Sequence, residues 1–515
     1  MFLKAKPLYV EAKKPIVILN REDAEELDIR ALDRVELSCN GKKEIGIVNI
    51  TESFVKPGEI GLYGCVEEGL CVKKGTKIRV EPAEPPESLA YIKSRLEGKV
   101  LKPMEIRQIV NDVVDHKLSE IEITSFVISL YHRTMSMEEA AALSMAMVET
   151  GKKLKLTNKT LYDKHSIGGV PGDKTSMILV PTVAAAGLTI AKTSSRAITA
   201  PAGTADKMEC ICPVSLSVDD IKRVVRKTNG CLVWGGALDL APADDIFIEI
   251  EHPLSIDPLL LPSVMSKKKA IGSKYLVVDI PTGKGVKIRT INEAKEMGNN
   301  FIELGKKLGI RVECVSTFGE QPIGFGIGPA LEAREALHIL SGHRIPQDQL
   351  DKVCDLCAVL FKFAGIRNGY KKAMDIIRSG KAERKFRQII GEQGGDPKIR
   401  PEDIPIGKES LQIKSKVSGK VLWINNTAIV QIAREAGAPK DKGAGILLHK
   451  KTGDSVKKGE TIFEIFAEKG YKLERTLDQM SENDLTVMGI GKTSEMMLAE
   501  IPEIEKNRKY FILER

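Results

Sequence analysis

A glycine-rich stretch in the first third of the chain has the composition of an anion-binding loop. An apolar run follows it and ends at Gly187; the stretch itself reads Lys164-His165-Ser166-Ile167-Gly168-Gly169-Val170-Pro171-Gly172-Asp173-Lys174-Thr175-Ser176. We expect a helix to begin near Thr175, so that its free N–H groups and positive dipole end face the loop. Such a loop can bind phosphate, with Ser166 and Ser176 donating hydroxyl groups and Lys164 adding positive charge. The alternative is a tight strand-to-helix connection without a ligand.

The same stretch nearly matches the P-loop of nucleoside-triphosphate-binding proteins. That motif requires a glycine directly before its lysine, whereas Asp173 precedes Lys174 here. We therefore do not expect this loop to hold a nucleoside triphosphate.

A second loop places small and hydroxyl residues around one arginine. It reads TSSRAITAPAGTADK from Thr193 to Lys207, after a strand-like segment at 189–192 and before a helix-like segment. A guanidinium group can recognise phosphate or carboxylate with two hydrogen bonds, so Arg196 is a candidate anion ligand. Ligands of open α/β sheets bind at the carboxyl ends of the strands. Two such loops after successive strands predict two bound anions, or one ligand with an anionic end beside a free anion.

An aspartate ahead of a third apolar run is a candidate proton donor. Asp257 precedes Pro258 and three leucines, and loss of hydration there would favour the protonated carboxyl group. Asp before Pro is also common in turns, so a turn or helix cap is the alternative. The basic run Lys267–Lys269 is interpreted as a solvated helix face.

Several other patterns do not support a cofactor or a metal. The run Gly324–Gly328 has the wrong spacing for a dinucleotide fingerprint, and the seven histidines form no metal-ligand pattern. The nine cysteines are scattered, and the pair Cys354/Cys357 lies in a helix-like apolar stretch without a second such pair. We expect buried thiols, no metal and no cofactor.

The composition is that of an ordinary globular protein. The chain has 515 residues, 42% of them hydrophobic and 29% charged, with a net charge of +8 and 5% aromatic residues. This excludes a disordered protein, and the few aromatic residues offer little stacking surface for nucleic acid. No apolar run reaches the roughly 20 residues that span a bilayer, and no secretory signal is recognisable, so we expect a cytoplasmic protein.

The elements that position these loops suggest an α/β multidomain fold. Short alternating runs predict a small β-rich domain at 1–85, which the proline-rich segment 81–86 separates from the rest. A helical lobe follows at 87–159, with part of 208–240 as a candidate addition. Alternating strand-like and helix-like runs predict a central mixed α/β lobe at 160–410. Residues 411–515 are expected to form a β-rich C-terminal α+β domain that is similar to biotinyl/lipoyl domains but lacks a carrier lysine.

The motifs together resemble those of a known enzyme family. Residues from about 88 onwards are similar to the pyrimidine-nucleoside (thymidine) phosphorylases, which are pentosyltransferases. The motifs that carry this resemblance are Lys164-His165-Ser166-x-Gly168-Gly169, Ser195-Arg196, Gly203-Thr204-x-Asp206-Lys207, Ser263-x-x-x-Lys267-Lys268 and Gln321-Pro322-x-Gly324. The extra N-terminal domain and the form of the 195–204 loop resemble the archaeal branch of this family that acts on AMP.

The resemblance implies that AMP and phosphate are converted to adenine and ribose 1,5-bisphosphate in nucleotide salvage, with CMP and UMP as further substrates. It implies that Asp257 donates a proton to the leaving base. The implied nucleotide contacts are Gly169, Ser195, Arg196, Ala197, Ile198, Thr199, Ala200, Thr204, Ser263 and Lys287. The implied phosphate contacts are Lys164, Ser166, Ser176, Ser195 and Thr204.

The family also implies a homodimer, which the N-terminal domain could extend to a higher oligomer. No nucleic-acid or membrane partner is expected. Two other functions stay open on the sequence alone: a pyrimidine-nucleoside phosphorylase, and a nucleotide-binding protein without catalysis.

Overall fold

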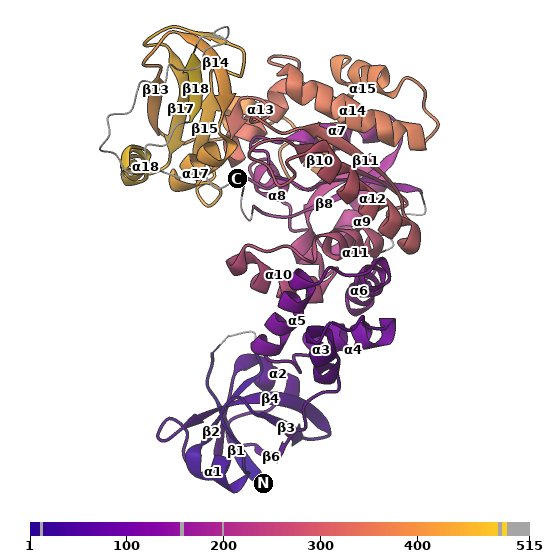
Figure 1. Cartoon of the computed structure of the whole chain (residues 1–515), viewed down its shortest axis with the longest axis vertical. Helices are drawn as coiled ribbons and strands as arrows, with labels where there is room; N and C mark the ends of the chain where they lie inside the picture. The colour runs from indigo at the N-terminus through magenta and orange to yellow at the C-terminus, as the bar shows by residue number, and fades with distance from the viewer. Residues whose placement is uncertain (11–13, 155–158, 198–199, 483–486, 492–515) are drawn as a thin grey trace, which may run out of the picture.

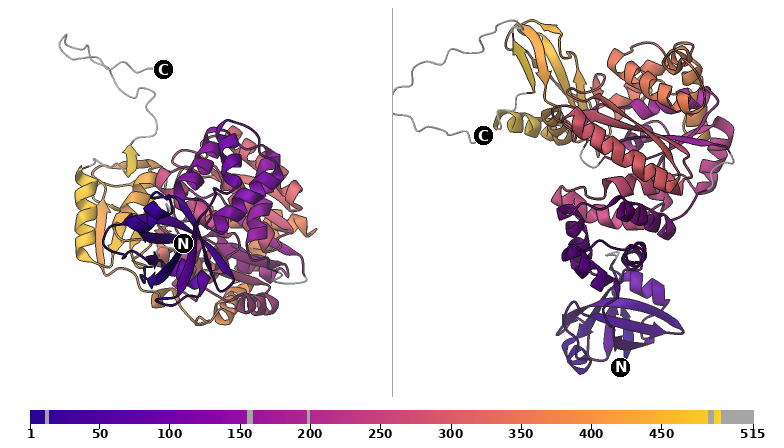
Figure 2. Two further views of the ribbon diagram at one scale, coloured as in Figure 1. Left: turned by 90° about the horizontal axis from the view of Figure 1, so that it is seen from below. Right: turned by 45° about the vertical axis from the view of Figure 1, so that its right-hand side comes forward.

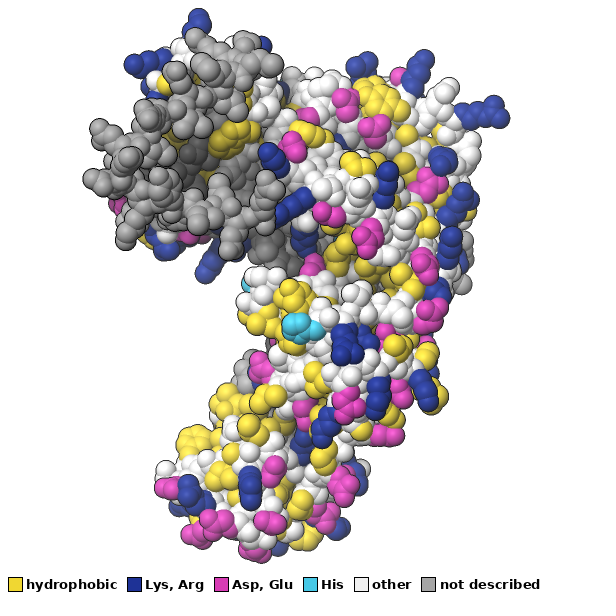
Figure 3. All heavy atoms as spheres, in the orientation of Figure 1, with side chains coloured by type: hydrophobic (Ala, Val, Ile, Leu, Met, Phe, Trp, Pro, Cys, Tyr) yellow, Lys and Arg dark blue, Asp and Glu magenta, His cyan; other side chains and the backbone are white. Residues whose placement is uncertain are grey.

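The computed structural model in Figure 1 describes residues 1–10, 14–154, 159–197, 200–482 and 487–491. A small β-domain lies at one end, a helical lobe follows it, and a larger α/β lobe carries the C-terminal domain on its side (Figures 1 and 2). Acidic and basic side chains are interspersed on the face drawn in Figure 3, as expected for a modest net charge. In the described part of the chain, no helix is long and apolar enough to cross a membrane.

The N-terminal domain is a closed β-barrel. Its strands alternate buried and exposed residues, as in β3, where Val35, Leu37 and Cys39 point into the core. The strand order around the barrel is β1-β5-β2-β4-β3-β6. The strands are β1 (Phe2–Pro7), β2 (Ile16–Asn20), β3 (Arg34–Cys39), β4 (Lys42–Thr51), β5 (Glu59–Leu62) and β6 (Lys77–Pro82), with helices α1 (Arg21–Glu26) and α2 (Gly64–Leu70) between them.

The helical lobe is built from amphipathic helices with strong start signals. Pro103 occupies the first turn of α4, and Ser136 with Glu139 forms a capping box at the start of α6. The helices are α3 (Ser88–Leu96), α4 (Pro103–Val114), α5 (Glu120–His132) and α6 (Met137–Thr150). A later helix, α10 (Pro242–Leu254), completes their apolar core through Phe247 and Ile250. The added segment is therefore α10 and not 208–240, whose helix α9 (Val218–Thr228) packs against the central sheet.

The central lobe contains a parallel five-stranded sheet in the order β11-β10-β7-β8-β9. Its strands are β7 (Leu161–Ser166), β8 (Thr189–Ser194), β9 (Gly230–Trp234), β10 (Tyr275–Thr282) and β11 (Arg311–Phe318). The strand-like segment predicted at 189–192 lies within β8. Because all strands run the same way, the loops after β7, β8 and β10 emerge at one edge of the sheet.

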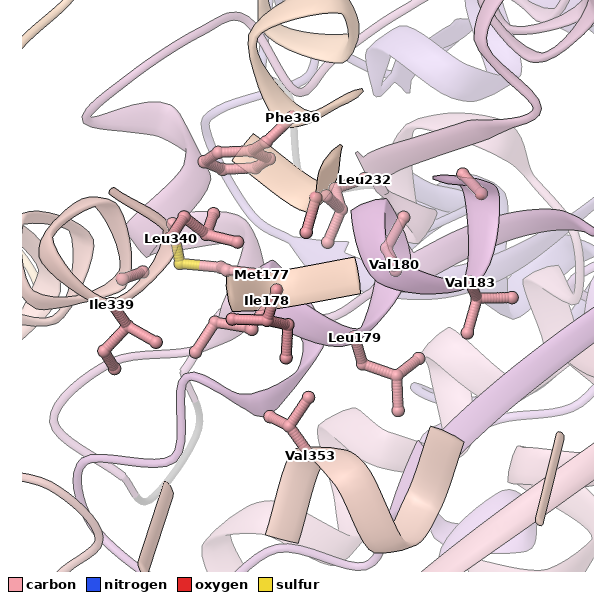
Figure 4. Close-up of a cluster of buried hydrophobic side chains, with 14 of the residues drawn as sticks. Met177, Ile178, Leu179, Val180, Val183, Leu232, Ile339, Leu340, Val353 and Phe386 are labelled. Carbon is pink, nitrogen blue, oxygen red and sulfur yellow. The ribbon is translucent and has the colours of Figure 1, made fainter. Parts of the chain in front are cut away.

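Helices cover both faces of this sheet. On one face, α7 contributes an almost wholly apolar surface, and Met177, Ile178, Val180 and Val183 pack with Leu232 of β9 (Figure 4). The helices of that face are α7 (Thr175–Ala185), α8 (Thr204–Glu209), α13 (Pro329–Leu340), α14 (Gln347–Phe363), α15 (Gly369–Arg378) and α16 (Lys381–Glu392). The opposite face is covered by α9 together with α11 (Leu260–Ala270) and α12 (Ile291–Leu308).

The C-terminal domain combines two small sheets with two helices. One sheet, β12-β15-β17-β13, includes β12 (Gly326–Ile327) from the central lobe and therefore joins the two domains; the other has the order β16-β14-β18. The remaining elements are β13 (Glu409–Lys414), β14 (Gly419–Ile424), α17 (Asn426–Glu435), β15 (Gly445–Leu448), β16 (Ser455–Val456), β17 (Thr461–Ala467), α18 (Gly470–Glu482) and β18 (Met488–Gly491).

Candidate active site

Three loops at the carboxyl edge of the central sheet lie against one another. The loop after β7 meets the loop after β10 at Gly169, where an added Cβ would lie 3.3 Å from the backbone nitrogen of Lys287. Gly169 has a φ of +100°, a conformation that side-chain-bearing residues rarely adopt. The loop after β7 is also tied to α8, which follows the loop after β8, because Lys207 Nζ donates to the carbonyl oxygen of Asp173 at 2.7 Å. The first predicted anion-binding loop thus contacts the Lys287 loop and is linked to the second loop through α8.

A buried carboxylate organises the first of these loops. Asp279, at the end of β10, accepts hydrogen bonds from Ser166 Oγ at 2.8 Å and from Thr317 Oγ1 at 2.6 Å. Lys352 Nζ lies 2.8 Å from the same carboxylate and Lys164 Nζ lies 3.8 Å from it. Burial lowers the pKa of Lys164, although the carboxylates of Asp173 and Asp279 oppose this shift. The sheet edge therefore holds two buried ammonium groups around one carboxylate.

The helix predicted to begin near Thr175 is confirmed as α7, which runs from Thr175 to Ala185. One of its free N–H groups is already satisfied, since Thr175 N donates to Asp173 Oδ1 at 2.9 Å. Burial alone would raise the pKa of Asp173, but the ammonium groups of Lys352, Lys164 and Lys207 hold it well below its usual value. A permanent negative charge therefore occupies the position where a P-loop has glycine.

Lys174 stabilises the fold of this loop and has no free ammonium group for a ligand. Its side chain is fully buried, and its Nζ lies 2.6 Å from Glu335 Oε2 and 3.1 Å from the carbonyl oxygen of Ile323. Glu335 in turn accepts hydrogen bonds from the backbone N–H groups of Phe325 and Gly326. The glycine-rich run 324–328 thus forms a turn around this ion pair.

The arginine of the second loop is held by carboxylates of the protein itself. Arg196 donates to both oxygens of Glu209, at 2.7 and 2.6 Å, and to Asp206 at 3.2 Å, and its guanidinium lies 4.8 Å from the ring centre of Trp234. The hydrogen bond to Glu209 raises the pKa of Arg196, and the same bond lowers the pKa of Glu209 to about 2. The expected role of this guanidinium as a free anion ligand is not supported by its contacts.

Asp206 fixes the shape of the second loop. Its Oδ2 accepts the N–H groups of Ala197, at 2.7 Å, and Gly203, at 2.9 Å, while Lys442 of the C-terminal domain lies 3.5 Å from Oδ1. The carboxylate therefore closes both ends of the loop that carries Ala200. Ser195 and Thr204 flank the same loop, whereas the predicted contacts Ile198 and Thr199 lie outside the described residues.

The predicted proton donor is closer to solvent than its sequence suggests. The Asp257 side chain is 41% exposed, and its Oδ2 lies 2.7 Å from Lys287 Nζ. The loss of hydration that we expected from the leucines after it is not observed. Asp257 and Lys287 are nevertheless brought together from segments thirty residues apart, as the family resemblance implies for two residues of one site.

The lysine run that follows is not a solvated helix face. Lys268 is buried and lies 2.8 Å from Asp163, and Lys267 Nζ lies 2.5 Å from the fully buried Asp244. Ser263 Oγ donates to the same Asp244 at 2.9 Å. The helix α11 is enclosed between the helical lobe and the sheet, so acidic partners on both sides neutralise Lys267 and Lys268, while Lys269 donates to the carbonyl oxygen of Leu308 at 2.7 Å.

Sequence reasoning missed Asp279, Lys352 and Asp244 as members of this region. Asp279 could have been recognised from the sequence, because it lies inside the apolar run Leu276–Ile280 and a buried carboxyl group needs a charged or hydrogen-bonding partner. Lys352 and Asp244 lie on ordinary helical segments and could not have been recognised in this way. The described residues contain no group of three or more His, Cys, Asp or Glu side chains arranged to hold a metal ion.

Comparisons with known proteins cover most of the chain. Residues 158–383 match the model "Glycosyl transferase family, a/b domain", residues 89–151 match "Glycosyl transferase family, helical bundle domain", and residues 421–484 match "Pyrimidine nucleoside phosphorylase C-terminal domain". A Thermofilum pendens protein named AMP phosphorylase is 45% identical, with 100% of both chains aligned. The AMP phosphorylase of Thermococcus kodakarensis is 50% identical over 90% of this chain and 92% of its own.

One solved structure shares the fold of more than half of the chain at low sequence identity. The anthranilate phosphoribosyltransferase of Thermus thermophilus superimposes with a TM-score of 0.50 and 18% identity. The match covers 59% of this chain and 98% of that protein.

Proposed function

The chain belongs to the AMP phosphorylases of the thymidine and pyrimidine-nucleoside phosphorylase family, and we propose that it converts AMP and phosphate to adenine and ribose 1,5-bisphosphate. The observation that carries this proposal is the 45% identity to an AMP phosphorylase over the whole chain, N-terminal barrel included. We propose CMP and UMP as further substrates, with inorganic phosphate as co-substrate and no cofactor.

The two loops would hold the two anions of this reaction. We propose that Lys164, Ser166 and Ser176 bind inorganic phosphate beside the N-terminus of α7, where burial keeps the lysine charge poorly screened. Ser195 and Thr204, at the two ends of the Asp206-held loop, would contact both the phosphate and the nucleotide. Because the reactants repel each other, fixed positive charge at the sheet edge is needed to hold them in line.

The bond exchange needs one proton. A phosphate oxygen forms a bond to the anomeric carbon as the bond from that carbon to the base nitrogen breaks, and the base leaves with the electron pair. Asp257 would supply the proton that neutralises the base. Its carboxylate is paired with Lys287 in the structure, so we propose that the nucleotide draws Lys287 towards itself and frees the carboxyl group to carry a proton.

The remaining nucleotide contacts follow from the same arrangement. Gly169 lets the first loop pack directly against the backbone of Val286 and Lys287, so we propose that these two loops contact the nucleotide together. Ser263 extends towards the same region from α11, where Asp244 fixes its hydroxyl group. The backbone of Arg196, Ala197 and Ala200 would contact the nucleotide, with the Arg196 side chain holding the loop.

We further propose a cytoplasmic homodimer to which the N-terminal barrel adds contacts. All nine cysteines are unpaired, as is usual in reducing compartments. The barrel exposes large apolar side chains, Phe2, Tyr9 and Phe54 among them, and Met104 and Ile121 do so on the helical lobe. Sedimentation of the full chain and of a chain lacking the barrel tests this assembly.

The test of function is a phosphate-dependent release assay with AMP, CMP and thymidine. We expect adenine release from AMP and no turnover of thymidine. The variant Asp257→Asn should lose most of the turnover while its nucleotide binding stays close to that of the wild type. Turnover of thymidine but not AMP would identify a nucleoside phosphorylase, and AMP binding without adenine release would identify a nucleotide-binding protein without catalysis.

A further inference from the structure

A second carboxyl group, that of Glu251, lies near Asp257 and is buried. Glu251 is in the last turn of α10, and only 5% of its surface is exposed. Its Oε1 accepts the backbone N–H of Leu259 at 3.0 Å. Leu259 is fully buried in the core of the helical lobe, so this hydrogen bond is shielded from water.

The same residue holds the turn at its other end. The backbone carbonyl oxygen of Glu251 accepts the N–H group of Ile256 at 3.2 Å and also that of Ser255, whose φ is +54°. The five residues 255–259 are therefore tied to Glu251 on both sides of Asp257. Asp257 lies in this turn and forms its ion pair with Lys287 of the α/β lobe. The position of the Asp257 carboxyl group therefore depends on how α10 holds the turn.

The charge environment of Glu251 favours a neutral carboxyl group. Among the described residues, no side-chain nitrogen of a lysine, arginine or histidine forms an ion pair within 4.0 Å of the Glu251 carboxyl oxygens, although the buried carboxylates elsewhere in the site have such partners. The charged groups that face it are Asp244 of α10, Asp257, Lys287 and, from α11, Lys267. Burial raises the pKa of Glu251 to about 8, and the charges of Asp257 and Asp244 add to this effect, against the Leu259 N–H and Lys287.

We propose that Glu251 is a positioning residue for Asp257, which holds the 255–259 turn as an uncharged carboxylic acid during turnover and competes with Asp257 for Lys287 when it ionises. The proposal rests on the proposed role of Asp257 as proton donor. An ionised Glu251 would compete with Asp257 for Lys287 and would draw water into the apolar pocket around Leu259. Turnover should therefore fall as Glu251 loses its proton.

Two substitutions separate the hydrogen bond from the charge. Glu251→Gln keeps an oxygen for the Leu259 N–H and cannot ionise, so kcat should stay within about threefold of the wild type at neutral pH, whereas Glu251→Ala leaves the N–H unpaired and should lower kcat about tenfold or more. The wild type should lose activity with an apparent pKa near 8, and Glu251→Gln should lack this loss. The control Glu249→Gln, on the exposed side of α10, should keep the wild-type profile.

A readout without turnover separates this proposal from the proposed function. The infrared difference spectrum between wild type and Glu251→Gln at neutral pH should contain the carbonyl stretch of one protonated carboxyl group, and the band should decline to about half as the pH reaches 8 and continue to fall above it. Absence of the band, an unchanged alkaline loss in Glu251→Gln, or equal loss of kcat in the Gln and Ala variants would each overturn the proposal. A wild type that shows the band but releases no adenine would instead contradict the proposed function.

Discussion

Removal of the Asp206 carboxylate should disable the second loop while leaving the fold intact. In the variant Asp206→Ala, the N–H groups of Ala197 and Gly203 lose an acceptor that lies 2.7 and 2.9 Å away. Hydrogen bonds to charged groups contribute about 1.5–3 kcal/mol each, so the loop in its present shape loses about 3–6 kcal/mol. In the variant the two N–H groups can bind water instead, so we expect only about half of this free energy to be lost from transition-state binding. This corresponds to a fall in kcat/KM for AMP of roughly 10- to 150-fold.

Steady-state kinetics with AMP and phosphate, together with thermal unfolding, measure this effect. Asp206→Asn retains an oxygen for the two N–H groups but removes the charge that faces Arg196 and Lys442, so its loss should be intermediate. Asp219→Ala is a matched control, because Asp219 is 92% exposed at the start of α9 and lies outside the site. If Asp206→Ala folds and its kcat/KM stays within about threefold of the wild type, the carboxylate does not shape the loop.

Three further variants test other parts of the site. Lys174→Met leaves Glu335 buried without a cation, so urea unfolding should show a loss of about 3–5 kcal/mol that Glu335→Gln partly restores; an unchanged midpoint would contradict this. Ser166→Ala should raise the KM for phosphate by roughly two- to tenfold and change the KM for AMP less, as a titration of each substrate would show. Glu209→Gln should be less stable than the wild type at pH 7 by at most about 1 kcal/mol, because the ion pair is partly exposed. The pKa of Glu209 is lowered to about 2 in the folded protein, so the ion pair stabilises the wild type fully only above the usual pKa of glutamate. In thermal unfolding at a series of pH values, the difference in stability between wild type and Glu209→Gln should therefore shrink and vanish as the pH falls to 2. A difference that does not change with pH would disprove this.

Local sequence patterns predicted the helices and strands well, because the residues that begin or end an element and the spacing of its apolar residues lie within or beside that element. Pro103 and the Ser136–Glu139 box mark helix starts, and the apolar run of β10 is typical of a strand buried on both faces. The glycine-rich turn before α7 was likewise predictable from residue type alone.

Pairings between distant segments could not be predicted in the same way. Arg196 looked like a free anion ligand because the carboxylate of Glu209 lies thirteen residues away and faces it only once α8 has formed. The lysines of α11 looked solvated because their partners, Asp163 and Asp244, come from β7 and α10. The burial of Asp257 was overestimated because the leucines after it turn into the core, while its own side chain points towards Lys287.

The most direct test of the central claim follows the oxygen atoms of phosphate. AMP is incubated with the full chain and inorganic phosphate labelled with oxygen-18, and the sugar product is examined by phosphorus NMR and mass spectrometry. We predict ribose 1,5-bisphosphate with a labelled oxygen between C1 and its phosphorus, formed in equal amount with adenine. Adenine release together with ribose 5-phosphate, or a C1 oxygen without label, would show that phosphate is not the nucleophile held at the glycine-rich loop.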